Sequence, residues 1–360
     1  MQDVLKQIAS ILYHDKKINT YKFALIRSLA DVAVGYEFEN DNENVYIPLK
    51  NLAYKWVAYY WVFMSDGDKE GVFQSQQHYG VQDVTFRESL EKLKTNHREL
   101  GLACDFITDG YFYSDEGNAK LSDAQSGVLK TVISDIKRGL NQPIRYAKGG
   151  GEHSFFQKER NHIVVRKEIF QSIRQHSLYI EALAVSEWAK WIGQQSLSGL
   201  TAGEAFSMMT KLPEGRQSIQ KYRKIFKGCD LVCPYSGRRL QDIDQDRFEL
   251  DHVIPIAVYP INDLWNLLPV FGKCNSGSGG KFDKIPAKEV LYGSVRIIGD
   301  IYEYYLDTDY SRLFQSQYKL RLVADTFGNK DWLANRAVAF MDSVAESRSV
   351  MRWNPQMFTT

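Results

Sequence analysis

Apolar residues recur at helical spacing along much of the first 140 residues, in the broad stripe typical of helices that cover a core. The segments with this pattern are 20–34, 51–64, 86–100 and 123–140. In the second segment Lys55 interrupts the apolar run, which is also too short to cross a bilayer. We therefore predict a buried helix there with an aromatic inner face. The residues of that face are Trp56, Tyr60, Trp61 and Phe63.

Polar and glycine-containing stretches separate these segments. Residues 39–44 contain only Asn, Asp and Glu and are predicted to be a polar connection. Residues 104–113 combine β-prone residues with Gly and Asp, which favours a short strand or hairpin. Residues 145–159 contain three consecutive glycines and are predicted to be a flexible loop or a domain boundary. Helical patterning is also seen in 163–195, in part of 197–227 and in 310–353.

Composition indicates a soluble protein with more than one unit. A chain of 360 residues is long for a single domain, and 44% hydrophobic with 25% charged residues is ordinary for a packed globular protein. The first residues carry charges and no apolar core segment, so no signal peptide is expected. The four cysteines do not suggest a disulfide framework. Reduced thiols and a cytoplasmic location are the simpler interpretation.

Charge is balanced overall but uneven along the chain. The net charge of +1 predicts no general attraction to DNA or to membranes. Residues 211–239, however, contain eight Lys or Arg and only two acidic residues, Glu214 and Asp230, which gives a local net charge of +6. By itself this run is most simply a solvated helix face. Because it comes directly before the polar motif described next, we predict that it contacts phosphates, through Lys221, Arg223, Lys224, Arg238 and Arg239.

The chemistry is concentrated in residues 229–286. A strand-like FELDHV carries Asp251 and His252 near its end, Asn266 lies in LWNLLPV, which is predicted to be a second apolar strand, and Asn275 opens a Gly/Ser-rich segment. Hydrolysis of a phosphodiester needs a divalent cation, for which Asp and Asn oxygens are suitable ligands. It also needs a base that titrates near neutrality, which histidine supplies. The sequence therefore predicts a metal-dependent hydrolytic site.

Strand geometry restricts how these groups meet. Neighbouring residues of a strand point to opposite faces, so Asp251 and His252 can share a site only where the strand ends and the chain turns. Pro255 and the loop up to Pro260 make such a turn plausible.

These residues resemble the HNH endonuclease family, with a His in a DH-x-I-P context, a middle Asn before Leu and a last Asn after Cys. The resemblance implies a β-hairpin and a helix that hold one Mg²⁺ or Mn²⁺ ion. It implies that His252 activates water, that Asp251 and Asn275 bind the metal, and that Asn266 braces the loop carrying the histidine. Lys281, Asp283 and Lys284 resemble the downstream K-x-D-K of the family. We add Lys281 and Lys284 to the predicted nucleic-acid contacts.

Many members of this family frame the finger with two Cys-x-x-Cys pairs that bind zinc. Here those four positions are Cys233, Ser236, Phe271 and Cys274. Only two of them are cysteines, and Cys229 supplies at most one more. We expect packed thiols and no structural zinc.

Other polar residues carry weaker patterns. His153 and His162 flank a glycine-containing loop without an acidic partner at metal-ligand spacing, and we expect surface histidines. Asp242, Asp244 and Asp246 lack the glycine of a calcium loop and are predicted to form a solvated turn.

Together these observations predict a mainly α protein with a small α+β insertion. We expect a helical recognition or regulatory domain (1–148), a helical connecting region (152–228), the ββα-metal finger (229–286) and a helical C-terminal extension (287–360). The leading hypothesis is Mg²⁺-dependent cleavage of DNA, with duplex favoured over single strands. A helical front half followed by a late HNH finger is similar to bacterial restriction and phage-defence nucleases. Two alternatives stay open: a ribonuclease toxin, and a nucleic-acid-binding module with an inactive site. A homodimer and partner proteins of a defence system also remain open, and no membrane association is expected.

Overall fold

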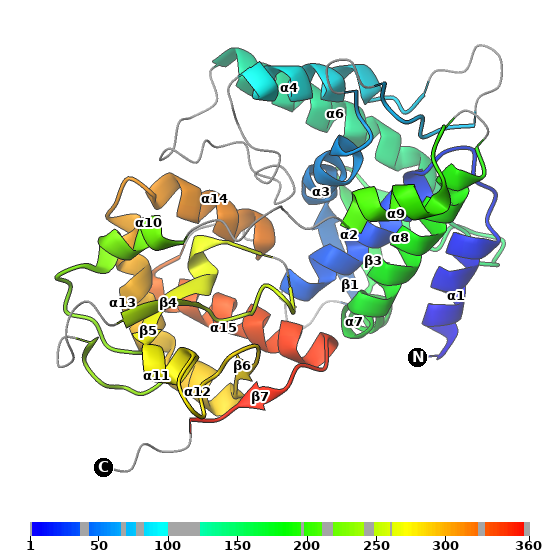
Figure 1. Ribbon diagram of the computed structural model, residues 1–360. Helices are drawn as coiled ribbons and strands as arrows, with labels where there is room; N and C mark the ends of the chain where they lie inside the picture. Colours follow the sequence, from blue (N-terminus) through cyan, green and yellow to red (C-terminus); the bar gives the residue numbers. More distant parts are fainter. Residues whose placement is uncertain are drawn as a thin grey trace. The chain divides into compact units, whose positions relative to one another are not determined.

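The computed structural model describes residues 2–36, 43–65, 70–76, 83–99, 123–195, 198–210, 219–240, 248–259, 261–322 and 328–355. The chain divides into two compact units. Unit 1 comprises Met1–Ala33 and Phe38–Lys211, and unit 2 comprises Val34–Glu37 and Leu212–Thr360. Both are mainly helical with small sheets, which confirms the predicted fold class (Figure 1). The predicted finger lies in unit 2 with the helices that follow it, and the finer four-part division stays a prediction.

Helices make up most of unit 1. They are α1 (Gln2–Tyr13), α2 (Tyr21–Gly35, which ends in unit 2), α3 (Leu49–Trp61), α4 (Arg87–Glu99), α6 (Asp123–Tyr146), α7 (Lys167–Gln175), α8 (Ser177–Gly193) and α9 (Ala202–Thr210). The helices predicted from the first four segments are confirmed. The aromatic face of α3 is buried as predicted, and Tyr60 is the centre of its packing. The Tyr60 ring centroid lies 4.8 Å from that of Phe86 and 5.0 Å from that of Trp188.

A three-stranded antiparallel sheet in unit 1 was not predicted. Its strands are β1 (Asn44–Pro48), β3 (His162–Arg166) and β2 (Gln157–Glu159), in that spatial order. The expectation of a helix from residue 163 was therefore wrong for the first residues of that segment. The run Ile163–Val165 is β-branched, and it pairs with strands on both sides before α7 begins at Lys167. The predicted strand at 104–113 lies outside the described residues.

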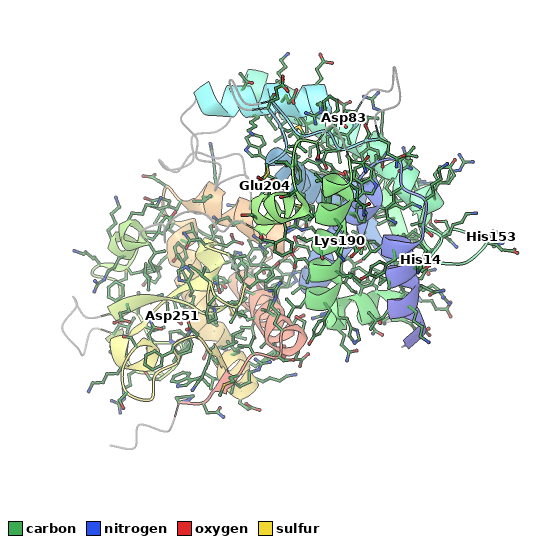
Figure 2. The ribbon with its side chains drawn as sticks, turned by 45° about the vertical axis from the view of Figure 1, so that its right-hand side comes forward. His14, Asp83, His153, Lys190, Glu204 and Asp251 are labelled. Carbon is green, nitrogen blue, oxygen red and sulfur yellow. The ribbon has the colours of Figure 1, made fainter. Side chains whose placement is uncertain are left out.

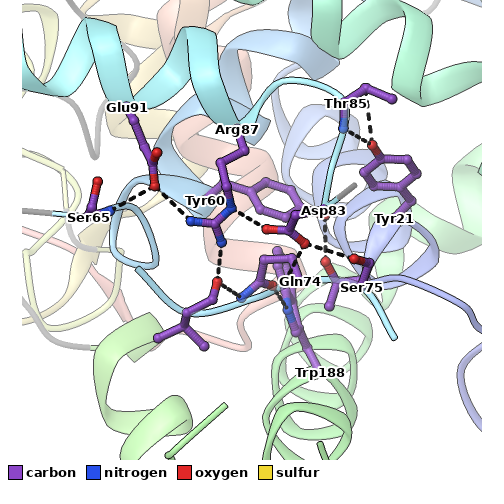
Figure 3. Close-up of polar contacts among 12 residues, drawn as sticks. Tyr21, Tyr60, Ser65, Gln74, Ser75, Asp83, Thr85, Arg87, Glu91 and Trp188 are labelled. Carbon is purple, nitrogen blue, oxygen red and sulfur yellow. Dashed lines mark hydrogen bonds and ion pairs between the residues drawn. The ribbon is translucent and has the colours of Figure 1, made fainter. Parts of the chain in front are cut away.

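A buried polar network in unit 1 connects the segment 70–76 to neighbouring helices (Figure 3). Trp188 donates its indole N–H to Gln74 Oε1 at 3.0 Å, and the Gln74 backbone N–H donates to Asp83 Oδ1 at 2.8 Å. Arg87 pairs with Asp83 and, at 2.7 Å, with Glu91. These polar groups have partners inside the protein, so the network is explained by fold stability alone.

Unit 2 is built around the hairpin of β4 (Phe248–His252) and β5 (Leu267–Phe271), followed by the short helix α11 (Gly272–Asn275). The other elements are α10 (Gln220–Arg223), η1 (Lys224–Phe226), η3 (Leu264–Asn266), β6 (Ile285–Pro286), α12 (Lys288–Gly293), α13 (Val295–Leu306), α14 (Ser311–Arg321), α15 (Lys330–Ser347) and β7 (Arg352–Trp353). Helix α13 supports the hairpin, because Tyr302 and Tyr305 donate to the carbonyls of Trp265 and Leu267 at 2.7 and 2.9 Å.

Unit 2 also contains a 3₁₀ turn at Asn266 and a pair of short parallel strands, β6 and β7. Asn266 was expected within a strand, but it ends the 3₁₀ turn η3 directly before β5. Strand β7 pairs in parallel with β6, which places the buried Trp353 beside the finger, where its indole donates to the Gly279 carbonyl at 2.7 Å. No helix in the described part of the chain is long and apolar enough to cross a membrane.

Candidate active site

Strand β4 carries the Asp-His pair at its end. In the hairpin register Asp251 lies opposite Leu268, and His252, the last residue of β4, lies opposite Leu267. Because side chains alternate along a strand, Asp251 shares its face of β4 with Glu249, whereas His252 projects from the other face. The strand ends at the histidine, as the predicted arrangement requires, and the chain bends away at Val253 and Ile254.

Asp251 is nearly buried, with 4% of its surface exposed (Figure 2). Tyr235 donates its hydroxyl to Oδ2 at 2.5 Å, and the Lys281 ammonium lies 3.2 Å from Oδ1. Burial disfavours the carboxylate and raises the pKa of Asp251 to about 6, although Lys281 and Tyr235 both act in the opposite direction. Each carboxylate oxygen thus has a protein partner.

Lys281 is the most enclosed charged residue of the site. Its Nζ donates to the carbonyls of His252, Phe282 and Lys284 at 3.0, 3.2 and 3.2 Å, and it also pairs with Asp251. The side chain is 1% exposed. The structure therefore separates Lys281 from the other predicted phosphate contacts, because its ammonium ties the loop after α11 to the end of β4.

Asn266 contacts the bend that follows His252. Its Oδ1 accepts from the Ile254 backbone N–H at 2.8 Å, and its Nδ2 donates to the Ile254 carbonyl at 2.9 Å. The backbone N–H of Val253 also donates to the Asn266 carbonyl at 3.0 Å. Both polar groups of Ile254 are thus satisfied by one buried side chain, which holds the two residues after the histidine in place.

His252 is half-buried and interacts with a residue that the sequence analysis missed. Its Nε2 lies 2.7 Å from Asn262 Oδ1. A carbonyl oxygen only accepts, so Nε2 carries the proton and the lone pair of the neutral imidazole lies on Nδ1. Asn262 is in the loop PIND between the two strands, and nothing in that loop distinguished it beforehand.

Glu249 was also missed. Asn275 donates its Nδ2 to Glu249 Oε2 at 2.9 Å, and the Ser276 hydroxyl lies 3.1 Å from each carboxylate oxygen. A Cβ at Gly272 would lie 2.9 Å from Glu249 Oε1, so a glycine there permits this approach. The two-residue spacing from Asp251 could have placed Glu249 on the same face in advance.

The oxygen donors on this face suit a hard cation. Glu249, Asp251 and Asn275 supply carboxylate and amide oxygens, the ligand type of Mg²⁺ and Mn²⁺. Among the residues described, no three or more His, Cys, Asp or Glu side chains are grouped so that they could hold a metal ion. The donor set fits a divalent ion that keeps water or substrate oxygens as further ligands.

Two stretches of the chain match known families. Residues 233–287 match the family described as HNH endonuclease. Residues 1–209, more than half of the chain, match the family described as Domain of unknown function (DUF8808). The chain belongs to this second family. No curated protein and no solved structure matches it. The HNH match confirms the resemblance seen in the sequence and supports a nuclease that acts on nucleic acid, a type that generally uses divalent metal ions.

Cys233, in the first turn of the HNH domain, lies next to Cys274. The Cys233 N–H donates to the Arg238 carbonyl at 2.8 Å, and the Gly237 N–H donates back to the Cys233 carbonyl at 2.9 Å. The buried Cys233 thiol contacts Cys274, and this contact lowers the pKa of Cys233 and raises that of Cys274. Ser236 interacts with both thiols. Cys229 donates instead to the Ile225 carbonyl at 3.4 Å.

The predicted phosphate contacts of unit 2 differ in exposure. Lys224, Arg238 and Arg239 are exposed, whereas Lys221, Arg223 and Lys284 are half-buried. The Arg223 guanidinium lies 4.9 Å from the centroid of the Phe248 ring at the start of β4. Of the other cations in the basic run, Lys227 is exposed, and Lys211 and Arg216 lie outside the described residues.

The two histidines with weaker patterns belong to unit 1. His153 is exposed on a loop of unit 1 (Figure 2), and His162 is half-buried in β3. The three aspartates at 242, 244 and 246 lie outside the described residues.

Proposed function

We propose that unit 2 is a divalent-metal-dependent endonuclease that hydrolyses DNA phosphodiester bonds at the HNH site. The observation that carries this proposal is the placement of His252. Asn262 accepts a hydrogen bond from Nε2 of His252, so Nδ1 is the nitrogen that can take up a proton. Asn266 holds the bend that follows His252. A histidine that is held in one tautomer at the end of a strand, directly after the buried Asp251, is suited to general-base catalysis.

Each site residue then has a role. His252 takes the proton of the attacking water on Nδ1. Asp251 and Asn275 would hold the metal ion, which supplies stabilisation of the charge that develops on the phosphate. Glu249 orients the Asn275 amide through the bond to Nδ2.

Lys281 and Asn266 are positioning residues in this proposal. Lys281 neutralises Asp251 and connects the loop of Asn275 to β4. Asn266 keeps the backbone after His252 in the bend that lets neighbouring strand residues serve one site.

The direct test is a time course with supercoiled plasmid in Mg²⁺, with EDTA as the metal-free control. His252→Ala should lower the cleavage rate by about 10²–10⁴-fold, the usual contribution of a general base. His153→Ala is the matched control and should cut like wild type, because that histidine lies on an exposed loop of unit 1. Full activity of His252→Ala would remove this residue from the mechanism.

The same preparation distinguishes the alternatives. Cleavage of a structured RNA while the plasmid stays intact would show that the protein is a ribonuclease. Metal-independent binding of DNA without cleavage of either substrate would indicate an inactive module.

One site holds one scissile phosphate, so we propose that each copy cuts one strand per binding event. A two-fold dimer would match the antiparallel strands of duplex DNA. A monomer should therefore give nicked circles first, and a dimer should give linear plasmid directly. Light scattering on the same sample identifies which case applies.

We further propose that the enzyme acts in restriction or phage defence, with unit 1 as the recognition part. The sequential arrangement of a helical unit before an HNH domain supports this context. Expression of the wild-type chain should lower the plating efficiency of at least some phages, and His252→Ala should restore it. Equal plating with both proteins across a broad phage panel would contradict a defence role that depends on cleavage.

A further inference from the structure

Phe282 is exposed and strained at the same time. It lies in the loop between α11 and β6, with 54% of its surface exposed. Its φ is 49°, in the left-handed region that bulky side chains rarely adopt. Within the described part of the chain only Arg160 and Ser349 share a positive φ without being glycine. Neither exposure of an aromatic ring to water nor this backbone conformation stabilises the fold.

The backbone of Phe282 is held by residues of the proposed active site. Its N–H donates to the Asn275 carbonyl at 2.9 Å. Its carbonyl accepts from Lys281 Nζ at 3.2 Å, and the same ammonium contacts Asp251 and the carbonyl of His252. The ring is therefore presented to solvent by a segment that is tied to both predicted metal ligands. Because the Phe282 backbone bonds directly to Asn275 and Lys281, a ligand bound at the site would reach this segment.

The surroundings favour a nucleic acid as the occupant. Lys273, on α11, is exposed. Lys284, two positions after Phe282, is half-buried, and the exposed Asp283 lies between them in the chain. An exposed ring in a segment that also carries lysines suits a ligand that alternates phosphates with flat bases, because the phosphates attract lysines and any base can stack on an aromatic ring. An apolar protein surface would gain little from charged residues this close in the chain.

We propose that Phe282 is a nucleic-acid contact whose ring stacks on a base next to the scissile phosphate. The assignment rests on the proposed function of the HNH site and adds a residue to it. Stacking on Phe282 displaces a base from its neighbours, and the strain of the loop keeps the ring available for that contact. Such strain at a functional position is a known use of unfavourable backbone conformations.

Binding is measured with the full chain in a His252→Ala background, so that cleavage does not interfere. The probes are a short fluorescein-labelled duplex and the corresponding single strand, titrated by anisotropy. Phe282→Leu and Phe282→Gly should each raise Kd by about 5- to 150-fold, the equivalent of the ~1–3 kcal/mol that stacking of one base contributes. Phe282→Tyr keeps the ring and should leave Kd close to that of the parent.

Thermal stability separates a contact from a structural role. Phe282→Gly relieves the positive φ, so its Tm should rise while its affinity falls. A residue needed only for folding would show the opposite change in Tm. Ser349→Gly is the matched control, because Ser349 has a φ of 51° in the same unit but takes no part in the site. Its Tm should rise without a change in Kd.

A second readout reports stacking directly. Duplexes that carry 2-aminopurine at successive positions around the mapped cut should brighten on binding at one position, and Phe282→Leu should abolish that increase. Unchanged Kd values and unchanged fluorescence in the Leu and Gly variants would overturn the proposal. If wild-type protein still cuts DNA in that case, the proposed function stands without Phe282. If Phe282-dependent binding is found but no cleavage occurs under any metal condition, the contact stands and the nuclease proposal fails.

Discussion

Replacement of Lys281 by Met tests whether the interior of the HNH site is held by one buried cation. Methionine has a similar length but cannot donate hydrogen bonds. The change leaves Asp251 with Tyr235 as its remaining partner, and it removes the donor shared by the carbonyls of His252, Phe282 and Lys284.

The expected loss is large because both charges of the pair are buried, with side chains 1% and 5% exposed. Removal of one partner of such a pair typically costs about 3–5 kcal/mol, since the other charge is left uncompensated. Lys284→Met is the matched control. It changes a half-exposed lysine three positions later and should alter stability by at most about 0.5 kcal/mol.

The assay is urea unfolding in EDTA, combined with hydrogen–deuterium exchange to locate the effect. Exchange should accelerate in β4 and in the loop after α11, while peptides of unit 1 serve as an internal reference. The double variant Lys281→Met/Asp251→Asn removes the uncompensated charge and should recover part of the loss. The reasoning is refuted if Lys281→Met costs no more than Lys284→Met, or if the double variant is no more stable than Lys281→Met alone.

Three further predictions follow from the same geometry. Asn275→Ala should abolish cleavage at low Mg²⁺ and recover part of it at high Mg²⁺ or Mn²⁺, as measured in a plasmid titration; activity that does not depend on metal concentration would contradict a ligand role. Joint replacement of the exposed Arg238 and Arg239 by Gln should flatten the slope of log K for DNA binding against log salt by up to about two. An unchanged slope would show that neither arginine contacts phosphate. Elemental analysis should find no stoichiometric zinc, because Phe271 occupies one ligand position and Ser236 another; about one zinc per chain would instead make the paired thiols ligands.

Local patterns in the sequence were enough to predict most helices of unit 1 and the family of the HNH domain. The helices of unit 1 that follow from apolar spacing form where they were predicted, because residues three and four apart lie on the same side of a helix whatever surrounds them. The order of Asp251, His252, Asn266 and Asn275, with their strand-like context, was enough to identify the HNH domain. Each of these inferences needs only the identity, order and spacing of residues along the chain, and no knowledge of which residues are in contact.

Tertiary structure decided what depends on distant partners. The β-branched run at residues 163–165 fits a strand or a buried helix equally well, and β1, more than a hundred residues earlier, supplies the pairing that makes it a strand. In the site, Glu249 meets Asn275 across 26 positions and Lys281 reaches the His252 carbonyl across 29. From the sequence, a lysine near the HNH motif is predicted to contact phosphate, but in the fold its ammonium is buried against Asp251. Spacing along the chain cannot show this. A charge is buried only where the folded chain brings an opposite charge or hydrogen-bond acceptors close enough to compensate it.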